Sequence, residues 1–361
     1  MIAPTTFAVH LTYTCPLACA HCCFSSSPQV KDRLDPDLVL ETIEGLGEHG
    51  IELAAFTGGE PFLLGRHLPR FIRAAKEQGL RTRVVTSGYF GRTPKAAARR
   101  LGEVVDAGLD ELSISWDDFH EEFVDFRTVR NVAAAARQFD LLVAVNVVQT
   151  AESRWTAARV RKELGVQVDD VVMESPVNLT GRAERELADE PLREDRALGP
   201  CPYVLTGPTL SAKGKLLACC GVIPDTERLV IDPEFRPDKL DADLAEARSS
   251  VLFSWLYLRG PYAILQWLNE NYGVEIPPPE LVGGNCQACK HLFEDPAIEE
   301  ILDDALLAKG PEVVGEYRLL ESLGAADPLS VVGLWSGRIT MQTRPSERWD
   351  QAREPKPASS P

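Results

Sequence analysis

The 361-residue sequence predicts an α/β fold in which a parallel sheet is followed by a smaller unit with a hairpin and helices. Two observations support this prediction. Strand-like apolar runs alternate with amphipathic helical patterns through the first half of the chain, and this alternation stops near residue 176. Six strand–helix steps fit either an open doubly wound sheet or a partial barrel, and both gather functional residues at the carboxyl ends of their strands.

The elements of the first half follow from local pattern and capping signals. The expected strands are apolar or β-branched and lie near residues 7–13, 52–56, 82–86, 110–115, 141–148 and 168–174. The expected helices have an amphipathic period and lie near residues 36–49, 66–79, 94–107, 119–138 and 152–164. Asp35-Pro36 and Thr93-Pro94 each place a capping side chain before a proline, which marks the start of the first and third helices.

The pattern changes in the second half of the chain. Residues 176–200 are polar and charged and contain three prolines, which predicts a linker. Residues 210–218 predict a hairpin with its turn at Lys213-Gly214. Helical patterns follow near residues 240–272, 296–309 and 311–323. The tail from about Arg344 is rich in proline and charge, which predicts disorder.

Composition excludes several classes of function. The formal charge of −16 repels phosphate backbones, so nucleic acid is not an expected partner, whereas a basic substrate segment is favoured at long range. No apolar run is long enough to span a membrane, and the N-terminal residues lack the basic and apolar segments of a signal peptide. We therefore expect a cytoplasmic protein, in which grouped thiols indicate a metal site before a disulfide.

Three of the nine cysteines, Cys15, Cys19 and Cys22, form a C-x3-C-x2-C group directly after the first expected strand. Three thiolates in one short loop suit a [4Fe–4S] cluster with one iron left without a protein ligand. Structural zinc, with His21 alongside, is the alternative. Zinc loops usually bring two thiol pairs together on a small knuckle, so a position at the start of a long strand–helix array favours the cluster.

A second motif, Thr57-Gly-Gly-Glu-Pro61, directly follows the second expected strand. Paired glycines let a backbone approach a ligand closely, and a carboxylate accepts hydrogen bonds from an ammonium group. In this order and position, the cysteine loop and this motif resemble those of the radical S-adenosylmethionine (SAM) superfamily, and the resemblance extends over most of the chain. It implies a partial (β/α)6 TIM barrel, a [4Fe–4S] cluster held by the loop, and SAM bound to the cluster's open iron.

The resemblance also implies which residues contact SAM at the ends of successive strands. These residues are Gly58, Gly59, Glu60, Pro61, Ser87, Ser113, Ser115, Asp117, Asn146 and Gly181. Glu60 is expected to accept from the methionyl amino group, and Gly181 belongs to a Pro-x4-Gly-Arg-Ala stretch expected near the adenine. Three positions depart from the family pattern. Ser87 stands where relatives often carry asparagine, His21 stands where they often carry an aromatic residue, and Cys23 adds a thiol beside the third ligand.

Four of the remaining cysteines form a second group in the C-terminal half: Cys201, Cys219, Cys286 and Cys289. As a ligand set they suit either tetrahedral zinc or a cluster. Their spacing resembles the twitch module, a shortened SPASM domain, which implies one auxiliary [4Fe–4S] cluster. Within this resemblance we expect a radical SAM barrel over residues 1–190, a small α+β twitch domain over 191–295, a helical segment over 296–343 and a disordered tail over 344–361.

Two cysteines are left over, each next to an expected ligand. Cys23 follows Cys22, and we expect it to be a packed thiol that ligates nothing. Cys220 follows Cys219, and neighbours in a strand point to opposite faces. Cys220 is therefore either a buried free thiol or a thiol that faces the substrate. In the second interpretation it resembles the hydrogen-atom donor of radical SAM enzymes that convert L-residues to D-residues in ribosomally made peptides.

The leading hypothesis is therefore maturation of a ribosomally synthesised peptide, with L-to-D epimerisation as its specific form and Cys220 as the catalytic residue. Thioether or carbon–carbon crosslinking of a peptide and oxidation of a small alcohol are alternatives on the same scaffold. A non-catalytic electron carrier or a zinc-stabilised binding protein is a different class, and residues 57–61 argue against it because neither needs a SAM pocket. An electron donor such as flavodoxin or ferredoxin is an expected partner.

Overall fold

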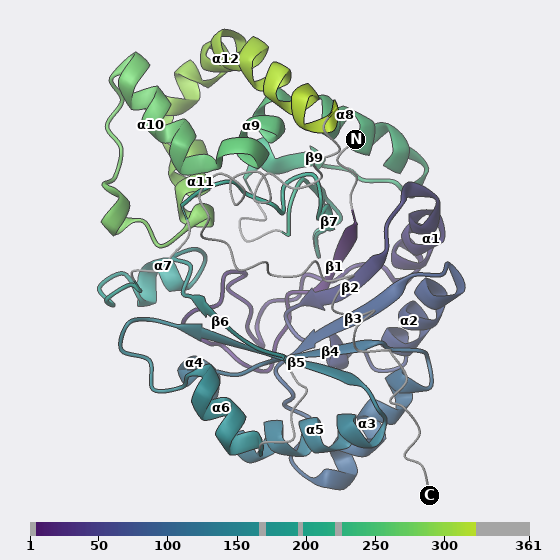
Figure 1. The fold of residues 1–361 in the computed structure, drawn as a ribbon. Coiled ribbons are helices and arrows are strands. Elements are labelled where there is room, and N and C mark those ends of the chain that lie inside the picture. Colours follow the sequence, from purple (N-terminus) through teal and green to yellow (C-terminus); the bar gives the residue numbers. More distant parts are fainter. Residues whose placement is uncertain (1–4, 166–170, 194–197, 221–225, 323–361) are drawn as a thin grey trace, which may run out of the picture.

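Six parallel strands form the main sheet in the order β6-β5-β4-β3-β2-β1, and they confirm the predicted α/β class. The strands are β1 (Thr6–Thr12), β2 (Leu53–Gly58), β3 (Arg81–Thr86), β4 (Glu111–Ser115), β5 (Leu142–Gln149) and β6 (Val171–Pro176). In this computed structural model the sheet curves into a partial barrel with helices on its outer side (Figure 1). The structure describes residues 5–165, 171–193, 198–220 and 226–322. Three predicted features lie wholly or partly outside these ranges: the start of the strand expected at 168–174, the last residue of the helix expected at 311–323, and the tail from Arg344.

Helices cover the outer face of the sheet. They are α1 (Pro36–Leu46), α2 (His67–Glu77), α3 (Pro94–Val105), α5 (Phe126–Gln138) and α6 (Ala157–Leu164). The side chains of Asp35 and Thr93 cap α1 and α3, which confirms both predicted starts. The single helix expected at 119–138 is instead two, α4 (Asp118–Glu121) and α5, because Asp125 accepts from the backbone N–H of Arg127 and begins a new helix.

Alternation along the strands separates an apolar outer face from a polar inner one. Phe7, Phe56 and Ile114 are completely buried in the core between sheet and helices. The alternate positions carry polar groups such as Arg83 and Glu111, whose side chains pair across β3 and β4 at 2.7 Å. The concave side of the barrel is therefore lined by groups able to bind a polar ligand.

The predicted hairpin forms and extends the main sheet. Its strands are β7 (Thr209–Leu210) and β8 (Leu216–Leu217), and β9 (Val230–Asp232) pairs with β8. Its turn lies at Lys213-Gly214, as expected, and Gly214 has a positive φ of 77°. Because β7 pairs with β1 in parallel, the smaller unit continues the sheet of the barrel (Figure 1).

Helices complete the C-terminal part: α8 (Leu240–Ser249), α9 (Val251–Arg259), α10 (Pro261–Tyr272), α11 (Asn285–Glu294) and α12 (Pro296–Ser322). The single stretch expected at 240–272 is broken twice, since Ser250 caps α9 and Gly260-Pro261 begins α10. The two helices expected near residues 296–323 are one, α12, which continues through Pro311. Pro311 has no backbone N–H, so the carbonyl of Leu307, one turn earlier, lacks its helical hydrogen bond. Leu307 is 78% exposed, so water can donate to this carbonyl instead.

The predicted linker at 176–200 is wrong over residues 177–187. This segment contains α7 (Ala183–Glu186), and Val177, Leu179 and Leu187 form a small buried cluster with Ala183. The polar composition hid this packing because its apolar residues are few and widely spaced. Among the residues that the structure describes, no helix combines the length and apolarity needed to cross a bilayer.

Candidate active site and its two cysteine groups

The loop after β1 brings the first three predicted metal ligands together at the carboxyl edge of the sheet. Its base is closed by the N–H of Cys15, which donates to the carbonyl of Ser27 at 3.1 Å. Within it, the N–H of Cys22 donates to the carbonyl of Cys19 at 3.1 Å. Cys15 and Cys19 are buried, while Cys22 is partly exposed. Backbone hydrogen bonds therefore hold the shape of this cysteine loop.

The three thiols influence one another electrostatically. Burial raises the pKa of Cys15 to about 12, and the charges of Glu60 and Cys22 act in the same direction. Burial also raises the pKa of Cys19, with contributions from Asp117, Cys22 and Cys15. Three thiolates cannot share this buried loop unless a cation lies among them. A metal cluster supplies that charge, so this donor set fits the three-cysteine iron–sulfur site that the sequence predicts.

A buried arginine, which sequence reasoning did not select, holds the cysteine loop in place. The guanidinium of Arg182 donates to the carbonyls of Cys19 at 2.8 Å, Ser25 at 3.0 Å and Ser26 at 2.6 Å. Its backbone N–H donates to the carbonyl of Cys22 at 3.0 Å. The only signal in the sequence is an arginine inside the Gly-Arg-Ala stretch, and its partners are 156 or more residues away.

The paired glycines of the second motif allow the end of β2 to approach the cysteine loop. A Cβ on Gly58 would lie 2.3 Å from the carbonyl oxygen of Thr12, and one on Gly59 would lie 2.2 Å from that of Thr14. No side chain fits at such distances. These glycines therefore allow two backbone segments to pack closely: the end of β2 and the chain that enters the cysteine loop.

Glu60 is completely buried and accepts four hydrogen bonds from the protein. Phe62 N–H and the Thr86 hydroxyl donate to one oxygen at 3.2 and 2.8 Å, and the N–H and hydroxyl of Ser87 donate to the other at 3.1 and 2.7 Å. Burial raises the pKa of this carboxyl, and these donors oppose the effect. Pro61 begins the short helical turn that supplies the N–H of Phe62. Ser87, an expected SAM contact, holds Glu60 in this structure.

The end of β4 presents a second buried carboxylate. Asp117 caps α4, and its Oδ1 lies 2.8 Å from Nδ1 of His120, while Oδ2 lies 3.6 Å from Nε2 of His21. Burial acts to raise the pKa of Asp117, but the two histidines outweigh it and lower the pKa to about 2. Burial lowers the pKa of His21 to about 4. His21 stacks on Phe119 with ring centroids 4.8 Å apart.

The remaining expected SAM contacts of the barrel lie at the same edge. Asn146 Nδ2 donates to the hydroxyl of Ser113 at 2.6 Å, and Ser115 is partly exposed at the end of β4. Gly181 lies against the cysteine loop, where an added Cβ would be 2.2 Å from the carbonyl oxygen of Cys23. The predicted residues thus lie in one region of the structure. Several of them are hydrogen-bonded to one another.

The second cysteine group assembles from three separate segments. Cys201 lies before β7, Cys219 follows β8, and Cys286 and Cys289 lie about one turn apart on α11. Burial raises the pKa of Cys286 to about 12 and that of Cys289 well above its usual value, and in both cases the charges of Cys201 and Cys219 contribute. The four predicted ligands are therefore neighbours in space. The helix that carries two of them was not predicted.

Cys220 lies close to both cysteine groups. Burial raises the pKa of its thiol well above the usual value, and the charges of Cys219, Cys286 and Cys201 add to this effect, as does that of Cys23 in the cysteine loop. Burial likewise raises the pKa of Cys23, with contributions from Cys22 and Cys286. The two cysteines that were not assigned as ligands thus lie where the groups meet.

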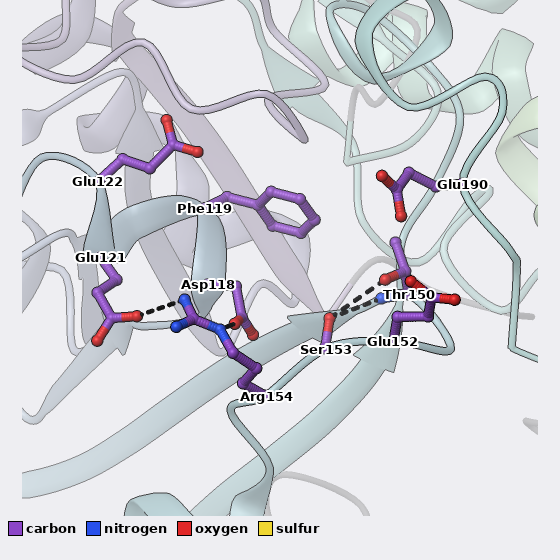
Figure 2. A pocket seen from close by; sticks show the side chains of 9 residues that line it. All are labelled: Asp118, Phe119, Glu121, Glu122, Thr150, Glu152, Ser153, Arg154 and Glu190. Atoms are coloured by element: carbon purple, nitrogen blue, oxygen red, sulfur yellow. Dashed lines mark hydrogen bonds and ion pairs between the residues drawn. The ribbon is translucent and has the colours of Figure 1, made fainter.

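Two cavities adjoin this region. One of about 830 Å³ is lined by Cys23 and Phe24 of the cysteine loop, Gly181 after β6, and Phe293 of α11. The other, of about 430 Å³, lies beyond Phe119 and is shown in Figure 2. Its charged lining residues are Asp118, Glu121, Glu122, Glu152, Glu190 and Arg154. Arg154 pairs with Asp118 and Glu121, each at 2.8 Å, so the other three carboxylates give this cavity an acidic wall.

The part of the chain that builds this site is similar to a known protein family. Residues 9–177 match the family model of the radical SAM superfamily. The match spans β1 to β6, including the cysteine loop and the Gly-Gly-Glu-Pro motif. The superfamily implies SAM and a [4Fe–4S] cluster, and the three thiols of the loop fit the cluster, as shown above.

Two sequence relatives and one solved structure are similar to parts of this chain. YydG of Bacillus subtilis strain 168, whose name assigns it to peptide biosynthesis, is 24% identical over 298 residues, which cover 80% of this chain and 92% of YydG. A PqqA peptide cyclase of Xanthomonas oryzae pv. oryzae is 31% identical over 157 residues, which cover 40% of each chain. The structure of anSMEcpe with bound AdoMet and a Cp18Cys peptide has a TM-score of 0.53 at 12% identity, covering 88% of this chain and 99% of that one, and supports the fold.

Proposed function

We propose that this protein modifies a ribosomally synthesised peptide by radical SAM chemistry, and that the modification converts an L-residue to its D-form. The position of Cys220 carries this proposal. Its thiol lies close to the second cysteine group and to Cys23 of the cysteine loop, and its raised pKa keeps it protonated at neutral pH. A protonated thiol between the two groups is what a hydrogen-atom donor requires.

The cofactors are part of the proposal. Cys15, Cys19 and Cys22 would hold three irons of a [4Fe–4S] cluster, and the residues around Glu60, Ser113 and Asn146 would bind SAM. When bound, these groups supply a 5′-deoxyadenosyl radical that removes a hydrogen atom from the substrate. The part of the protein is to position the substrate carbon and to exclude water.

The second cysteine group is proposed to hold an auxiliary [4Fe–4S] cluster within a twitch-like unit over residues 191–295. The ligand set alone suits tetrahedral zinc as well as a cluster. The spacing of the four cysteines along the chain resembles the twitch module, and this resemblance supports a cluster over zinc.

The role of Cys220 follows from the chemistry of its thiol. Once a substrate Cα–H bond has been broken, the S–H bond of Cys220 breaks and its hydrogen atom forms a new C–H bond. Delivery to the face opposite the abstraction inverts the carbon. The sulfur is left one electron and one proton short, and a one-electron donor such as flavodoxin or ferredoxin, together with a proton from solvent, restores the thiol.

A peptide substrate is supported by the relatives and by the shape of the site. The match to YydG covers 80% of this chain, and its name refers to peptide biosynthesis. The cavity of about 830 Å³ opens beside Cys23 and Phe24 and continues to Phe293, which is room for several residues of an extended peptide. We propose that the substrate reaches Cys220 through this cavity.

Replacing Cys220 with alanine tests the proposal. The variant should retain both clusters, cleave SAM and remove the substrate hydrogen atom, but yield unepimerised, fragmented or adducted peptide. In deuterated water the wild-type product should gain one deuterium, because a thiol proton exchanges with solvent before transfer. Cys23→Ala is the matched control and should make normal product. Full product from Cys220→Ala would rule out the thiol-donor mechanism.

Peptide crosslinking is the second candidate, because the PqqA peptide cyclase match covers 40% of this chain. Crosslinking needs no hydrogen atom returned to the substrate. Unchanged product from Cys220→Ala, together with a product two mass units lighter than the substrate, would favour it. Epimerisation in light water leaves the mass unchanged.

A further inference from the structure

Cys19 also belongs to a second, compact group of potential metal ligands, to which the proposed function assigns no role as a group. The sulfur of Cys19 and ring nitrogens of His21 and His120 all lie within 4.8 Å of one another. Cys19 is buried, and the side chains of His21 and His120 are 13% and 11% exposed. One thiolate and two imidazoles in a closed space are a ligand set that suits Zn²⁺, with a water molecule as fourth ligand.

A carboxylate orients both histidines from behind. Asp117 lies 2.8 Å from Nδ1 of His120 and 3.6 Å from Nε2 of His21. Metal-binding histidines usually give their second nitrogen to such a carboxylate, which fixes the ring and its tautomer. The remaining nitrogen of His21, Nδ1, is buried and has no hydrogen-bond partner among the residues that the structure describes. A bound metal ion would satisfy that atom.

We propose that Cys19, His21 and His120 bind one zinc ion when the cysteine loop lacks its cluster, and that this zinc blocks cluster assembly. The blocking part of this inference rests on the proposed function, because it requires Cys19 to be a cluster ligand. Zinc binding replaces the proton of the Cys19 thiol with a Zn–S bond and changes no oxidation state. Since one sulfur cannot serve both metals, the loop holds either zinc or the iron–sulfur cluster.

Site-resolved alkylation of the full-length wild-type chain tests zinc binding. Metal-free protein is treated anaerobically with iodoacetamide, with and without saturating ZnCl₂, and the labelling rate of each cysteine is followed by mass spectrometry. We expect zinc to lower the alkylation rate of Cys19 by about tenfold or more, and to change the alkylation rates of Cys15 and Cys22 by less than about twofold. Equal protection of the three cysteines, or none at Cys19, would overturn the proposal. Zinc bound by the second cysteine group does not affect this comparison within the loop.

A variant then tests the blocking. His120→Gln keeps a donor for Asp117 but removes a good zinc ligand, and circular dichroism verifies its fold. Zinc added before reconstitution should lower iron uptake by about half in the wild type, or about four of eight irons, and have little effect on His120→Gln. The matched control is His49→Gln, since His49 pairs with Asp241 at 2.7 Å far from the loop, and it should behave as wild type.

Two outcomes separate this inference from the proposed function. Equal inhibition by zinc of wild type and His120→Gln would overturn the blocking proposal while leaving radical SAM chemistry intact. A wild-type loop that takes up no iron even without zinc would instead overturn the proposed cluster, and with it the blocking. The alkylation result would still decide whether Cys19, His21 and His120 bind zinc.

Discussion

The two cysteine groups of this protein are built in opposite ways. Cys15, Cys19 and Cys22 come from one short loop whose backbone is closed by local hydrogen bonds and held by Arg182. The second group brings together segments at residues 201, 219 and 286–289, and it forms only when the hairpin and α11 pack against each other. A local group is visible in the sequence and is positioned by the loop, whereas a dispersed group depends on the whole C-terminal fold.

The largest expected effect comes from removing the first group. Changing Cys15, Cys19 and Cys22 together to alanine should abolish SAM cleavage, because no sulfur remains to hold the cluster. About half of the roughly eight irons in reconstituted protein should stay, since the second group does not depend on the loop. Iron analysis and detection of 5′-deoxyadenosine measure the two effects separately.

The reciprocal change is the control for this prediction. Cys286→Ala combined with Cys289→Ala should lose the other half of the iron and keep SAM cleavage. If either multiple variant lost all of its iron, the two groups would not be separate units. Zinc rather than iron in the second group after anaerobic purification would contradict the auxiliary cluster.

The next effect concerns SAM rather than iron. Glu60→Gln removes a negative charge beside the expected position of the SAM ammonium, a loss of about 1.5–3 kcal/mol, or about ten- to a hundredfold in SAM affinity. Iron content should not change. Titration calorimetry measures the affinity, and the exposed Glu52→Gln is the matched control. Unchanged SAM binding would place the pocket elsewhere.

Replacing Arg182 should have a smaller effect, which is confined to the first cysteine group. Arg182→Ala leaves the buried carbonyls of the cysteine loop without donors, at about 1–3 kcal/mol for each group left unsatisfied. Iron in the first group should fall several-fold while the second group keeps its own. The exposed Arg185→Ala, in the helix α7 that begins directly after Arg182, should behave as wild type. Equal loss from both groups would show that Arg182 stabilises the whole fold and has no particular effect on the loop.

The smallest expected effect at neutral pH is on the unfolding free energy, and it comes from replacing His10, which lies between the two cysteine groups. Its ring packs on Phe24 at 4.6 Å, and burial lowers its pKa to about 4, an effect that the nearby main chain of Cys220 partly offsets. Because the folded-state pKa is below that of the unfolded chain, this histidine contributes stability above pH 6.5 that is lost as the pH falls towards 4. The expected loss is about 3 kcal/mol.

Chemical denaturation at several pH values tests this expectation. His10→Gln should flatten the dependence of the unfolding free energy between pH 6.5 and 4. His49→Gln, whose histidine pairs with Asp241 at 2.7 Å, is the matched control and should leave the His10-dependent slope in place. A wild-type profile that is flat across this range would contradict the assigned cause.

The sequence predicted those features whose determinants lie close together in the chain. The cysteine loop, the Gly-Gly-Glu-Pro motif and the caps Asp35 and Thr93 are all contiguous signals. The division of the helical patterns at Asp125 and Ser250 was missed, although both are residue types that cap helices. Local patterns therefore indicate the elements of the fold more reliably than their ends.

The features that the sequence did not reveal are those fixed by distant partners. Arg182 lies in a segment whose composition indicates a linker, and its partners in the cysteine loop are 156 to 163 residues away. His120 becomes a potential ligand only because α4 brings it beside His21. In both cases the role comes from packing, which no window of the sequence contains.

The contacts of Arg182 have a consequence for the order in which the chain is made. The cysteine loop leaves the ribosome early, but the donors that fix its carbonyls arrive more than 150 residues later. β1 likewise lies between β2 and β7, so one of its edges stays open until residue 209 has been synthesised. During translation the first group therefore exists as three thiols on an unclamped loop. Metal insertion that precedes the emergence of Arg182 would meet a flexible peptide, and insertion that follows it would meet a formed site.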